Sequence, residues 1–213
     1  MYKDITGIIL SGGKSIRMGE NKSFLKIGEI TVIDHISNLM KSIFSEVIIV
    51  TNEPHLYQYL NLKTFPDIYQ NIGPIAGIHS GLMNSRTEKN FVISCDIPLM
   101  NAQMIKSIVD FKSDAICVVP KADGFLQQLC AVYSKSLTSA IEEIITADNN
   151  DETRDSSQTK RKCKIHNLIS SVPSSIIENI ETLNGYHSDI FLNMNKPEDY
   201  SLILSILSGI KPV

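Results

Sequence analysis

The chain has 213 residues, of which 43% are hydrophobic and 20% are charged, and this composition excludes a disordered protein. Its formal net charge of −3 argues against a surface built to bind nucleic acid or an anionic membrane. The four cysteines form no Cys-x-x-Cys pair, which argues against a zinc knuckle or a redox dithiol. The sequence begins without the pattern of a signal peptide and contains no uncharged run as long as a membrane span. We therefore expect one globular domain over residues 1–213 of a cytoplasmic protein.

The first predicted element is a buried strand over residues 5–10, which runs directly into a glycine-rich loop. The loop contains three glycines and three cations, which are Gly12, Gly13, Gly19, Lys14, Arg17 and Lys22. Glycines allow the backbone to lie against a ligand, and successive backbone N–H groups can bind an anion. Arg17 and Lys22 add charges that suit phosphate oxygens. The alternative is a solvated turn with ordinary surface cations.

This loop matches neither of the two common nucleotide-binding motifs. A Walker A loop requires Gly-Lys-Ser/Thr after a glycine and four residues, and here Glu20 follows Gly19. The pattern Gly-x-Gly-x-x-Gly is also absent from the loop. The sequence therefore predicts neither a P-loop ATPase nor a standard NAD site.

The next elements predict a strand–helix–strand unit and hence a parallel sheet. Apolar residues at helical spacing predict a helix over residues 31–44, with Thr31 as its cap and Asp34 at its start, and residues 46–51 form a buried strand. Asn52 follows that strand, where ligands of open α/β sheets bind. It has an alternative role as the cap of a short helix that starts at Pro54.

Residues 62–67 read as an extended segment that ends at Asp67, and a turn at Gly73-Pro74 starts the next helix. Gly77 and Gly81 lie four residues apart on that helix, where glycine lowers helix stability. Close approach of a ligand and close packing of the helix on the sheet are both open explanations.

Residues 91–95 form another predicted buried strand, which ends at Asp96. A carboxylate in this position faces the ligand-binding edge of a parallel sheet and suits Mg²⁺ bound to nucleotide phosphates. The alternative is that Asp96 caps the predicted helix over residues 102–111, although several residues separate the two.

The second half of the chain carries fewer functional signals. Residues 148–164 are strongly polar and read as a long loop or a poorly ordered segment, whose basic end either contacts a phosphorylated substrate or is solvated. The other predicted elements are strands at 114–120 and 124–133 joined by an Asp123-Gly124 hairpin, helices at 135–147 and 164–172, an extended segment at 176–183, a strand at 189–192 and a last helix at 197–207.

Four motifs occur in a fixed order. They are Leu10-Ser-Gly-Gly-x-Ser-x-Arg-Met-Gly-x-x-Lys22, Gly73-Pro-Ile-Ala-Gly77, Cys95-Asp-Ile-Pro98 and Asn193-Met-Asn-Lys-Pro-Glu-Asp199. Together they resemble nucleotidyltransferases with a GT-A-like Rossmann fold, and most closely the molybdenum cofactor guanylyltransferase (MobA-type) family. The resemblance implies an α/β fold with a single three-layer domain and a mostly parallel mixed sheet. It is weak over residues 148–188.

The resemblance also implies roles for individual residues. The backbone of Leu10, Ser11 and Gly12 would bind the nucleotide, and the Gly12-Gly13 pair fits GTP. Lys22 and Arg17 would bind phosphates and act in catalysis with Asp96, the Mg²⁺ ligand, which also contacts the nucleotide. Asn52 and Asp67 would contact GTP, and Asn195 would contribute to a second metal or substrate contact. The chain departs from the family pattern with Ser11 in place of alanine and Lys196 in place of threonine.

The expected activity is the transfer of GMP from GTP to molybdopterin, with Mg²⁺ as cofactor and release of pyrophosphate. Such a transfer needs positioning and charge neutralisation more than a catalytic base, because the attacking phosphate is already anionic. Possible partners are molybdoenzyme chaperones or other cofactor-biosynthesis proteins. The alternatives are a cytidylyltransferase or sugar-phosphate nucleotidyltransferase of the same fold, and a non-catalytic nucleotide-binding module.

Overall fold

The computed structural model describes residues 1–12, 21–149 and 158–209. The strands are β1 (Tyr2–Leu10), β2 (Lys26–Ile27), β3 (Ile30–Thr31), β4 (Phe44–Val50), β5 (Lys63–Phe65), β6 (Lys89–Ser94), β7 (Cys117–Ala122), β8 (Phe125–Leu126), β9 (Cys130–Ser134) and β10 (Ser174–Ile177). The α-helices are α1 (Val32–Ile43), α2 (Pro74–Asn84), α3 (Ala102–Val109), α4 (Thr138–Asn149), α5 (Gln158–Ser171) and α6 (Pro197–Leu207). Four short 3-10 helices are η1 (Lys22–Phe24), η2 (Pro54–Leu60), η3 (Lys135–Leu137) and η4 (Ile180–Thr182).

The central sheet has the strand order β10-β7-β9-β6-β1-β4-β5, and β8 pairs with β7 at its side. Neighbouring strands from β6 to β5 are parallel, whereas β9 runs antiparallel to both β6 and β7. The chain places β4 and β5 on one side of β1 and then crosses to β6 on its other side. This mostly parallel mixed sheet confirms the predicted α/β fold, and β1 lies at the point where the strand order reverses.

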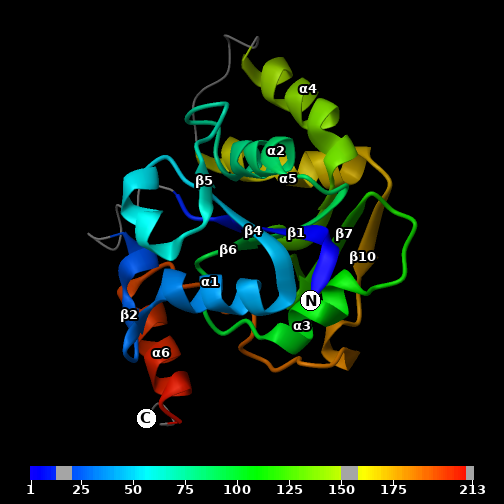
Figure 1. Cartoon of the computed structure of the whole chain (residues 1–213). Coiled ribbons are helices and arrows are strands. Elements are labelled where there is room, and N and C mark those ends of the chain that lie inside the picture. The colour runs from blue at the N-terminus through cyan, green and yellow to red at the C-terminus, as the bar shows by residue number, and fades with distance from the viewer. Residues whose placement is uncertain (13–20, 150–157, 210–213) are drawn as a thin grey trace.

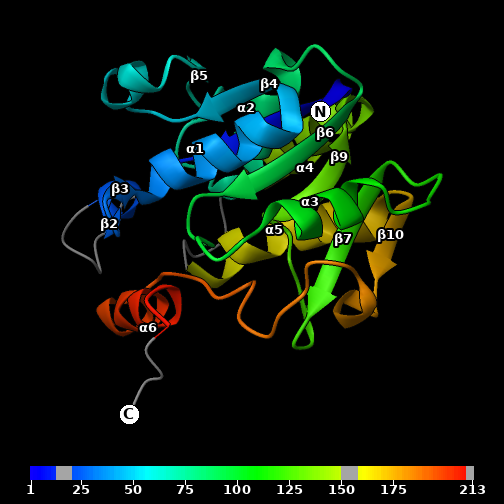
Figure 2. The ribbon, with the colours of Figure 1, turned by 60° about the horizontal axis from the view of Figure 1, so that its bottom comes forward.

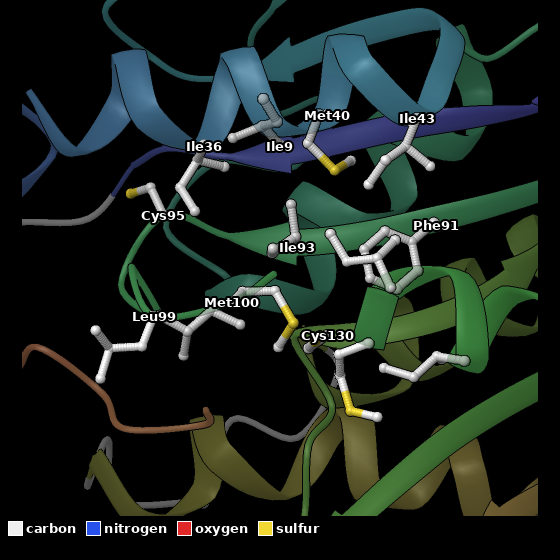
Figure 3. Close-up of a cluster of buried hydrophobic side chains, with 14 of the residues drawn as sticks. Ile9, Ile36, Met40, Ile43, Phe91, Ile93, Cys95, Leu99, Met100 and Cys130 are labelled. Carbon is white, nitrogen blue, oxygen red and sulfur yellow. The ribbon is translucent and has the colours of Figure 1, made fainter. Parts of the chain in front are cut away.

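Helices cover both faces of the sheet, which gives three layers (Figure 1). Helices α1 and α3 lie on one face, and α2, α4 and α5 lie on the other. Side chains alternate between the two faces along β1, so that Ile9 joins the core under α1 while Ile8 joins the core under α2. Figure 3 shows the first core, where Met40 of α1 packs beside Ile9, Phe91 and Ile93.

Side-chain caps explain where α1 and α3 begin, and the cap predicted at Thr31 is confirmed. In α1 the Thr31 hydroxyl accepts the Asp34 backbone N–H at 3.2 Å, and the Asp34 carboxylate accepts the Thr31 N–H at 3.1 Å. This reciprocal pair is a capping box, which satisfies two backbone donors at once. Helix α3 begins after Asn101, whose side chain accepts the Met104 N–H at 2.9 Å. Asp96 is therefore not the cap of α3, and that alternative is wrong.

The predicted hairpin at Asp123-Gly124 joins β7 and β8, with φ of 51° at Asp123 and 79° at Gly124. Both residues adopt the left-handed conformation that a two-residue hairpin turn requires. The predicted continuous strand over residues 124–133 is wrong, because the chain leaves β8 after Leu126 and re-enters the main sheet as β9.

The polar segment 148–164 is helical at both of its ends. Residues 150–157 lie outside the described residues, but α4 ends at Asn149 and α5 begins at Gln158, earlier than the helix predicted over 164–172. Ile165, Leu168 and Ile169 of α5 are buried. The sequence of residues 158–164 is mostly polar and has no apolar period, which explains why the pattern did not reveal the start of this helix.

Two predicted extended segments near the C-terminus also differ from the structure. The segment 176–183 leaves the sheet after Ile177 and continues into the 3-10 helix η4. The predicted strand 189–192 is a turn, in which the Leu192 N–H donates to the Asp189 carbonyl at 2.9 Å. Ile190 and Phe191 are buried against the core under α1, so their apolar character reflects packing rather than pairing with a strand.

The chain after η4 runs back across the molecule to α6, as Figure 2 shows. Helix α6 is attached to the small β2–β3 hairpin, because the Tyr200 hydroxyl donates to the Lys26 carbonyl at 2.6 Å. Among the described residues, none of the helices is long and apolar enough to cross a membrane.

Candidate functional site

The predicted site residues lie at one edge of the sheet, where four parallel strands have their carboxyl ends. Leu10 ends β1, and Ser11 follows it; Asn52, Asp67 and Asp96 each lie two residues beyond the ends of β4, β5 and β6. These four strands are neighbours in the sheet. Their carboxyl ends form the crevice in which ligands of open α/β sheets bind, next to the strand at which the order reverses.

The strand pairing extends one residue beyond β1 and fixes the start of the glycine-rich loop. The Ser11 N–H donates to the Val50 carbonyl at 2.9 Å, and the Cys95 N–H donates to the Leu10 carbonyl at 3.2 Å. At Gly12 an added Cβ would meet no atom of the described residues within 4 Å, so toward them this backbone is open on one side. Gly13 and Arg17 lie outside the described residues.

Lys22 connects Asp96 to the C-terminal motif. Its ammonium Nζ donates to the Asn195 side-chain oxygen at 3.0 Å and to the Met194 carbonyl at 3.1 Å. The same Nζ lies 3.6 Å from Oδ2 of Asp96, and the two side chains are 22% and 18% exposed. The structure thus brings together three predicted residues, Lys22, Asp96 and Asn195, that come from three distant parts of the sequence.

Local hydrogen bonds hold these residues in place. The Met194 N–H donates to the backbone carbonyl of Asp96 at 2.8 Å. Oδ2 of Asp199, in the first turn of α6, accepts the N–H groups of Asn195 at 2.9 Å and of Lys196 at 2.8 Å. Asp199 therefore satisfies the N–H of the residue that precedes α6 and at the same time fixes the loop that carries Asn195.

Asn52 and Asp67 form a second pair on the β4–β5 side of the site. The Asn52 amide Nδ2 donates to Oδ2 of Asp67 at 2.9 Å, and the Asp67 N–H donates to the Asn52 side-chain oxygen at 3.0 Å. Burial raises the pKa of Asp67, and the hydrogen bond from Asn52 partly opposes this rise. Asn52 is thus engaged with Asp67, and the residue that precedes η2 is Glu53, whose side chain makes no capping hydrogen bond to that helix.

The two glycines of α2 have different surroundings. A Cβ on Gly81 would lie 2.6 Å from Ile8 Cγ2, inside the core, so this glycine permits close packing of α2 on the sheet. A Cβ on Gly77 would lie 3.3 Å from Leu10 Cδ2 and 3.6 Å from Asp67 Oδ1. Gly77 therefore faces two predicted nucleotide-binding residues, whereas Gly81 serves packing alone.

A group of four polar side chains is buried next to the carboxyl ends of β1 and β6. It consists of Ser11, Ser23, Tyr57 and Cys95, and we call it the Ser11 cluster. Ser11 Oγ lies 2.8 Å from Ser23 Oγ and 2.9 Å from the Tyr57 hydroxyl. Burial raises the pKa of the Cys95 thiol, so Cys95 is protonated at neutral pH and takes part as a weak hydrogen-bonding group.

The arrangement around Asp96 suits one divalent cation that also binds phosphates. The Asp96 carboxylate and the Asn195 amide oxygen are oxygen ligands of the kind that Mg²⁺ prefers, and both lie close to the same Nζ atom of Lys22. Among the described residues, no group of three or more His, Cys, Asp or Glu side chains could hold a metal ion. The protein ligands fit an ion that takes its remaining ligands from substrate phosphates and water.

Sequence reasoning missed three contributors to the site. Gln70 donates to the Asn52 side-chain oxygen at 3.4 Å and to the Asp67 carbonyl at 2.6 Å. Tyr57 reaches Ser11 from η2, and the Met194 carbonyl accepts from Lys22. The sequence contained one indication that Gln70 belongs to the site, which is its position three residues after Asp67. Nothing in the sequence pairs Tyr57 with Ser11, 46 residues apart.

The fold has three layers, with a central sheet covered by helices on both faces. A lysine and a carboxylate at the carboxyl ends of its strands are typical of the nucleotidyltransferase class of enzymes. The chain belongs to the MobA-like NTP transferase family, whose model matches residues 7–161. These findings confirm the predicted fold and the predicted enzyme class.

Named relatives agree with this assignment. A Carboxydothermus hydrogenoformans protein named "Probable molybdenum cofactor guanylyltransferase" is 32% identical over 97% of this chain and 98% of its own length. A solved Archaeoglobus fulgidus structure, named molybdopterin-guanine dinucleotide biosynthesis protein A, has a TM-score of 0.76 at 19% identity and covers 96% of this chain and 100% of its own. A Mycobacterium tuberculosis protein solved in complex with manganese has a TM-score of 0.65 at 14% identity, covering 95% and 99%. The two structures show a shared fold.

Proposed function

We propose that this protein transfers GMP from GTP to molybdopterin, with release of pyrophosphate. The observation that carries the proposal is the convergence of Lys22, Asp96 and Asn195 at the ligand-binding edge of the sheet. The names of the relatives supply the substrate pair. Possible partners among cofactor-biosynthesis proteins or molybdoenzyme chaperones, and a cytoplasmic location, remain predictions.

The nucleotide would lie across the carboxyl ends of β1, β4, β5 and β6. The backbone of Leu10, Ser11 and Gly12 would face the nucleotide, since Gly12 is open on one side. The guanine base carries N–H donors on one edge, and the Asp67 carboxylate is an acceptor for them. Asn52 and Gln70 hold the Asp67 segment in place, and they would thereby support selection of the base.

The transfer itself requires one bond to form and one to break at the α-phosphorus of GTP. A terminal phosphate oxygen of molybdopterin attacks the α-phosphorus, and the bond to the bridging oxygen of pyrophosphate breaks, so that the pyrophosphate leaves with the electron pair. Lys22 would neutralise the charge that develops on the phosphates, and Arg17 would act with it. Asp96, with Asn195 nearby, would hold Mg²⁺, which would supply positive charge to stabilise the same phosphates. A manganese complex of a protein with the same fold is consistent with a divalent ion.

Thermal unfolding with each of the four NTPs and Mg²⁺ tests the nucleotide, and pyrophosphate release with molybdopterin tests the reaction. A ligand that binds only the folded state at 100 times its Kd stabilises it by about 2.7 kcal/mol. We expect the melting temperature to rise with GTP and stoichiometric pyrophosphate to appear when molybdopterin is added. Stabilisation by CTP instead would move the proposal to cytidylyl transfer, and no response to any nucleotide together with no pyrophosphate would refute it.

Two lysine variants sharpen this experiment. Lys22→Ala should reduce both the GTP-dependent rise and the rate, because it removes the ammonium group at the site. Lys63→Ala is the matched control, since Lys63 lies on β5 in an exposed ion pair with Glu46 at 3.4 Å. It should leave both readouts unchanged, and equal effects of the two variants would remove Lys22 from the site.

A further inference from the structure

The Ser11 cluster lies between the elements that carry the proposed catalytic residues. Its members follow β1, sit in η1 and η2, and follow β6. All four are buried, with exposed fractions of 1% for Ser11, 2% for Ser23, 0% for Tyr57 and 6% for Cys95. A buried polar group without a hydrogen-bond partner lowers the stability of the fold. The hydrogen bonds among these four side chains therefore allow β1, β6, η1 and η2 to pack together at this point.

The contacts satisfy every hydrogen of the cluster. Besides its bonds to Ser23 and Tyr57, Ser11 Oγ donates to Cys95 Sγ at 3.6 Å, and Ser23 Oγ lies 3.1 Å from the same sulfur. With Ser11 donating to Cys95, Cys95 donates to Ser23, while Ser23 and Tyr57 each donate to Ser11. Each hydrogen is then used once, and Ser11 uses its hydrogen and both lone pairs. Ser11 is therefore the centre of the cluster.

The cluster is directly connected to both charged residues of the site. Ser23 is the residue after Lys22, and Cys95 is the residue before Asp96. The Ser23 N–H also donates to the Asn21 side chain at 3.1 Å, which fixes the start of η1 around Lys22. On the other side, Cys95 lies at the edge of the apolar core near Ile36 of α1, so it cannot shift without disturbing packed side chains (Figure 3).

We propose that the side chains of Ser11, Ser23 and Tyr57 are positioning residues for nucleotidyl transfer, which fix the distance between the Lys22 ammonium group and the Asp96 carboxylate. The proposal rests on the proposed function, since it assigns to these side chains the alignment of the phosphate-binding lysine with the metal-binding carboxylate. It gives the hydroxyl of Ser11 a role that is separate from the contact of its backbone with the nucleotide.

The test compares Ser11→Ala with Ser37→Ala. Ser37 of α1 is also fully buried, but its hydroxyl has no hydrogen-bond partner among the described residues. Both variants therefore lose a buried hydroxyl oxygen. In Ser11→Ala this oxygen belongs to a hydrogen-bond network, and in Ser37→Ala it does not. Two readouts are measured: the Mg²⁺ concentration that gives half of the GTP-dependent rise in melting temperature, and kcat against KM for GTP.

In Ser11→Ala we expect the half-maximal Mg²⁺ concentration to rise and kcat to fall, each by at least about tenfold, because the variant loses all three hydrogen bonds of Ser11 Oγ. KM for GTP should change by less than about twofold, because none of the hydrogen bonds of the cluster, among the described residues, involves Asn52 or Asp67 on the base side. Tyr57→Phe removes one oxygen from the outer end of the cluster and should give a smaller change of the same kind. Ser37→Ala should match the wild type in both readouts.

The outcomes separate this proposal from the proposed function. If the wild type responds to GTP and Mg²⁺ but Ser11→Ala and Tyr57→Phe have the same Mg²⁺ dependence and kcat as Ser37→Ala, the positioning role is wrong. It is also wrong if Ser11→Ala and Ser37→Ala weaken stability and activity equally. A wild type with neither GTP-dependent stabilisation nor transfer would overturn the proposed function, and this inference with it.

Discussion

The ammonium group of Lys22 connects η1 to the end of β6 and to the segment before α6 through contacts with three oxygen atoms. These belong to Asp96 after β6 and to Met194 and Asn195 before α6. An ion pair between partly exposed side chains contributes at most about 1 kcal/mol to stability. The arrangement therefore matters more for the position of charge at the sheet edge than for the stability of the fold.

Replacement of the Asp96 carboxylate tests this distinction. Asp96→Asn should lower kcat by at least about 100-fold, because it removes the negative charge that would hold the cation beside the transferring phosphates. The melting temperature should hardly change, since Asp96 binds Met194 through its backbone carbonyl. The measurement is the rate of pyrophosphate release together with thermal unfolding.

Asp123→Asn provides the control for this carboxylate. Asp123 is exposed and lies in the β7–β8 turn with φ of 51°, a conformation that asparagine adopts readily. This variant loses the same charge and should retain full activity. Full activity of Asp96→Asn at saturating Mg²⁺ would show that the cation is held elsewhere.

The half-buried carboxylate of Asp67 predicts a pH-dependent contribution to the free energy of unfolding. Burial raises its pKa in the folded protein above the ordinary value of 3.8. A folded-state pKa above the unfolded value means that the folded protein binds the proton more tightly, so the contribution to stability is present at low pH and is lost as pH rises through the raised pKa.

The free energy of unfolding of the wild type minus that of Asp67→Asn should therefore fall as pH increases from below 3.8 and then level off above the folded-state pKa. Urea unfolding of both proteins at a series of pH values measures this difference. A difference that rises with pH would mean that hydrogen bonding to the carboxylate, chiefly from Asn52, outweighs its burial.

Part of the site was predictable because short motifs at strand ends map onto one edge of a parallel sheet. Asp96 could be placed from the buried strand before it, and Lys22 from the glycine-rich loop. The roles assigned to these residues remain proposals. The Ser11 cluster could not be predicted, because the position of Tyr57 depends on how η2 folds back against β1, which no local pattern records.

At the scale of single elements, helix α2 packs closely on β1 because of Gly81. A methyl group at this position would lie 2.6 Å from Cγ2 of Ile8, a side chain that is completely buried. Overpacking of this kind typically costs about 1–3 kcal/mol, whereas alanine improves helix propensity by about 1 kcal/mol. The loss of stability from overpacking should therefore exceed the gain from helix propensity.

We accordingly expect Gly81→Ala to lower the melting temperature by about 2–8 °C. Gly77→Ala is the comparison, since its nearest contact would be 3.3 Å from Leu10, which is only partly buried. It should destabilise less, and weaken GTP binding more, because Leu10 and Asp67 lie on the nucleotide side. Thermal unfolding with and without GTP measures both effects, and a stabilised Gly81→Ala variant would contradict this account of the helix.

The sequence predicted elements well where local signals were strong. The Thr31–Asp34 capping box, the Asp123-Gly124 turn and the buried parallel strands all carry such signals. It predicted poorly where tertiary packing decides the conformation, as at Ile190 and Phe191, which are buried in a turn. The early start of α5 was also missed, since its first residues are polar and lack the period of an amphipathic helix.

On the scale of the whole molecule, the two apolar cores share the same strands. Adjacent residues of β1, β4 and β6 point into opposite cores, as Ile8 and Ile9 do. Loss of either core therefore exposes the strands that support the other. This coupling supports the prediction of one domain and makes independent unfolding of the two layers unfavourable.

Urea unfolding monitored in two ways tests this coupling. The chain has 7 tyrosines and no tryptophan, so tyrosine fluorescence reports on tertiary packing while far-ultraviolet circular dichroism reports on helices. We expect the two transitions to coincide with a single midpoint. Separate midpoints would show that one helical layer unfolds before the other and would contradict the single-domain prediction.

The contacts of Lys22 also bear on the order in which a newly made chain acquires its site. Lys22 binds Met194 and Asn195, which follow it by 172 and 173 residues. At typical rates of synthesis these residues are added roughly 10–30 s after Lys22. A chain still attached to the ribosome can thus present the strand ends of β1 and β4 before it has the residues that lock Lys22 beside Asp96. The site is therefore completed only after every strand of the central sheet has been synthesised.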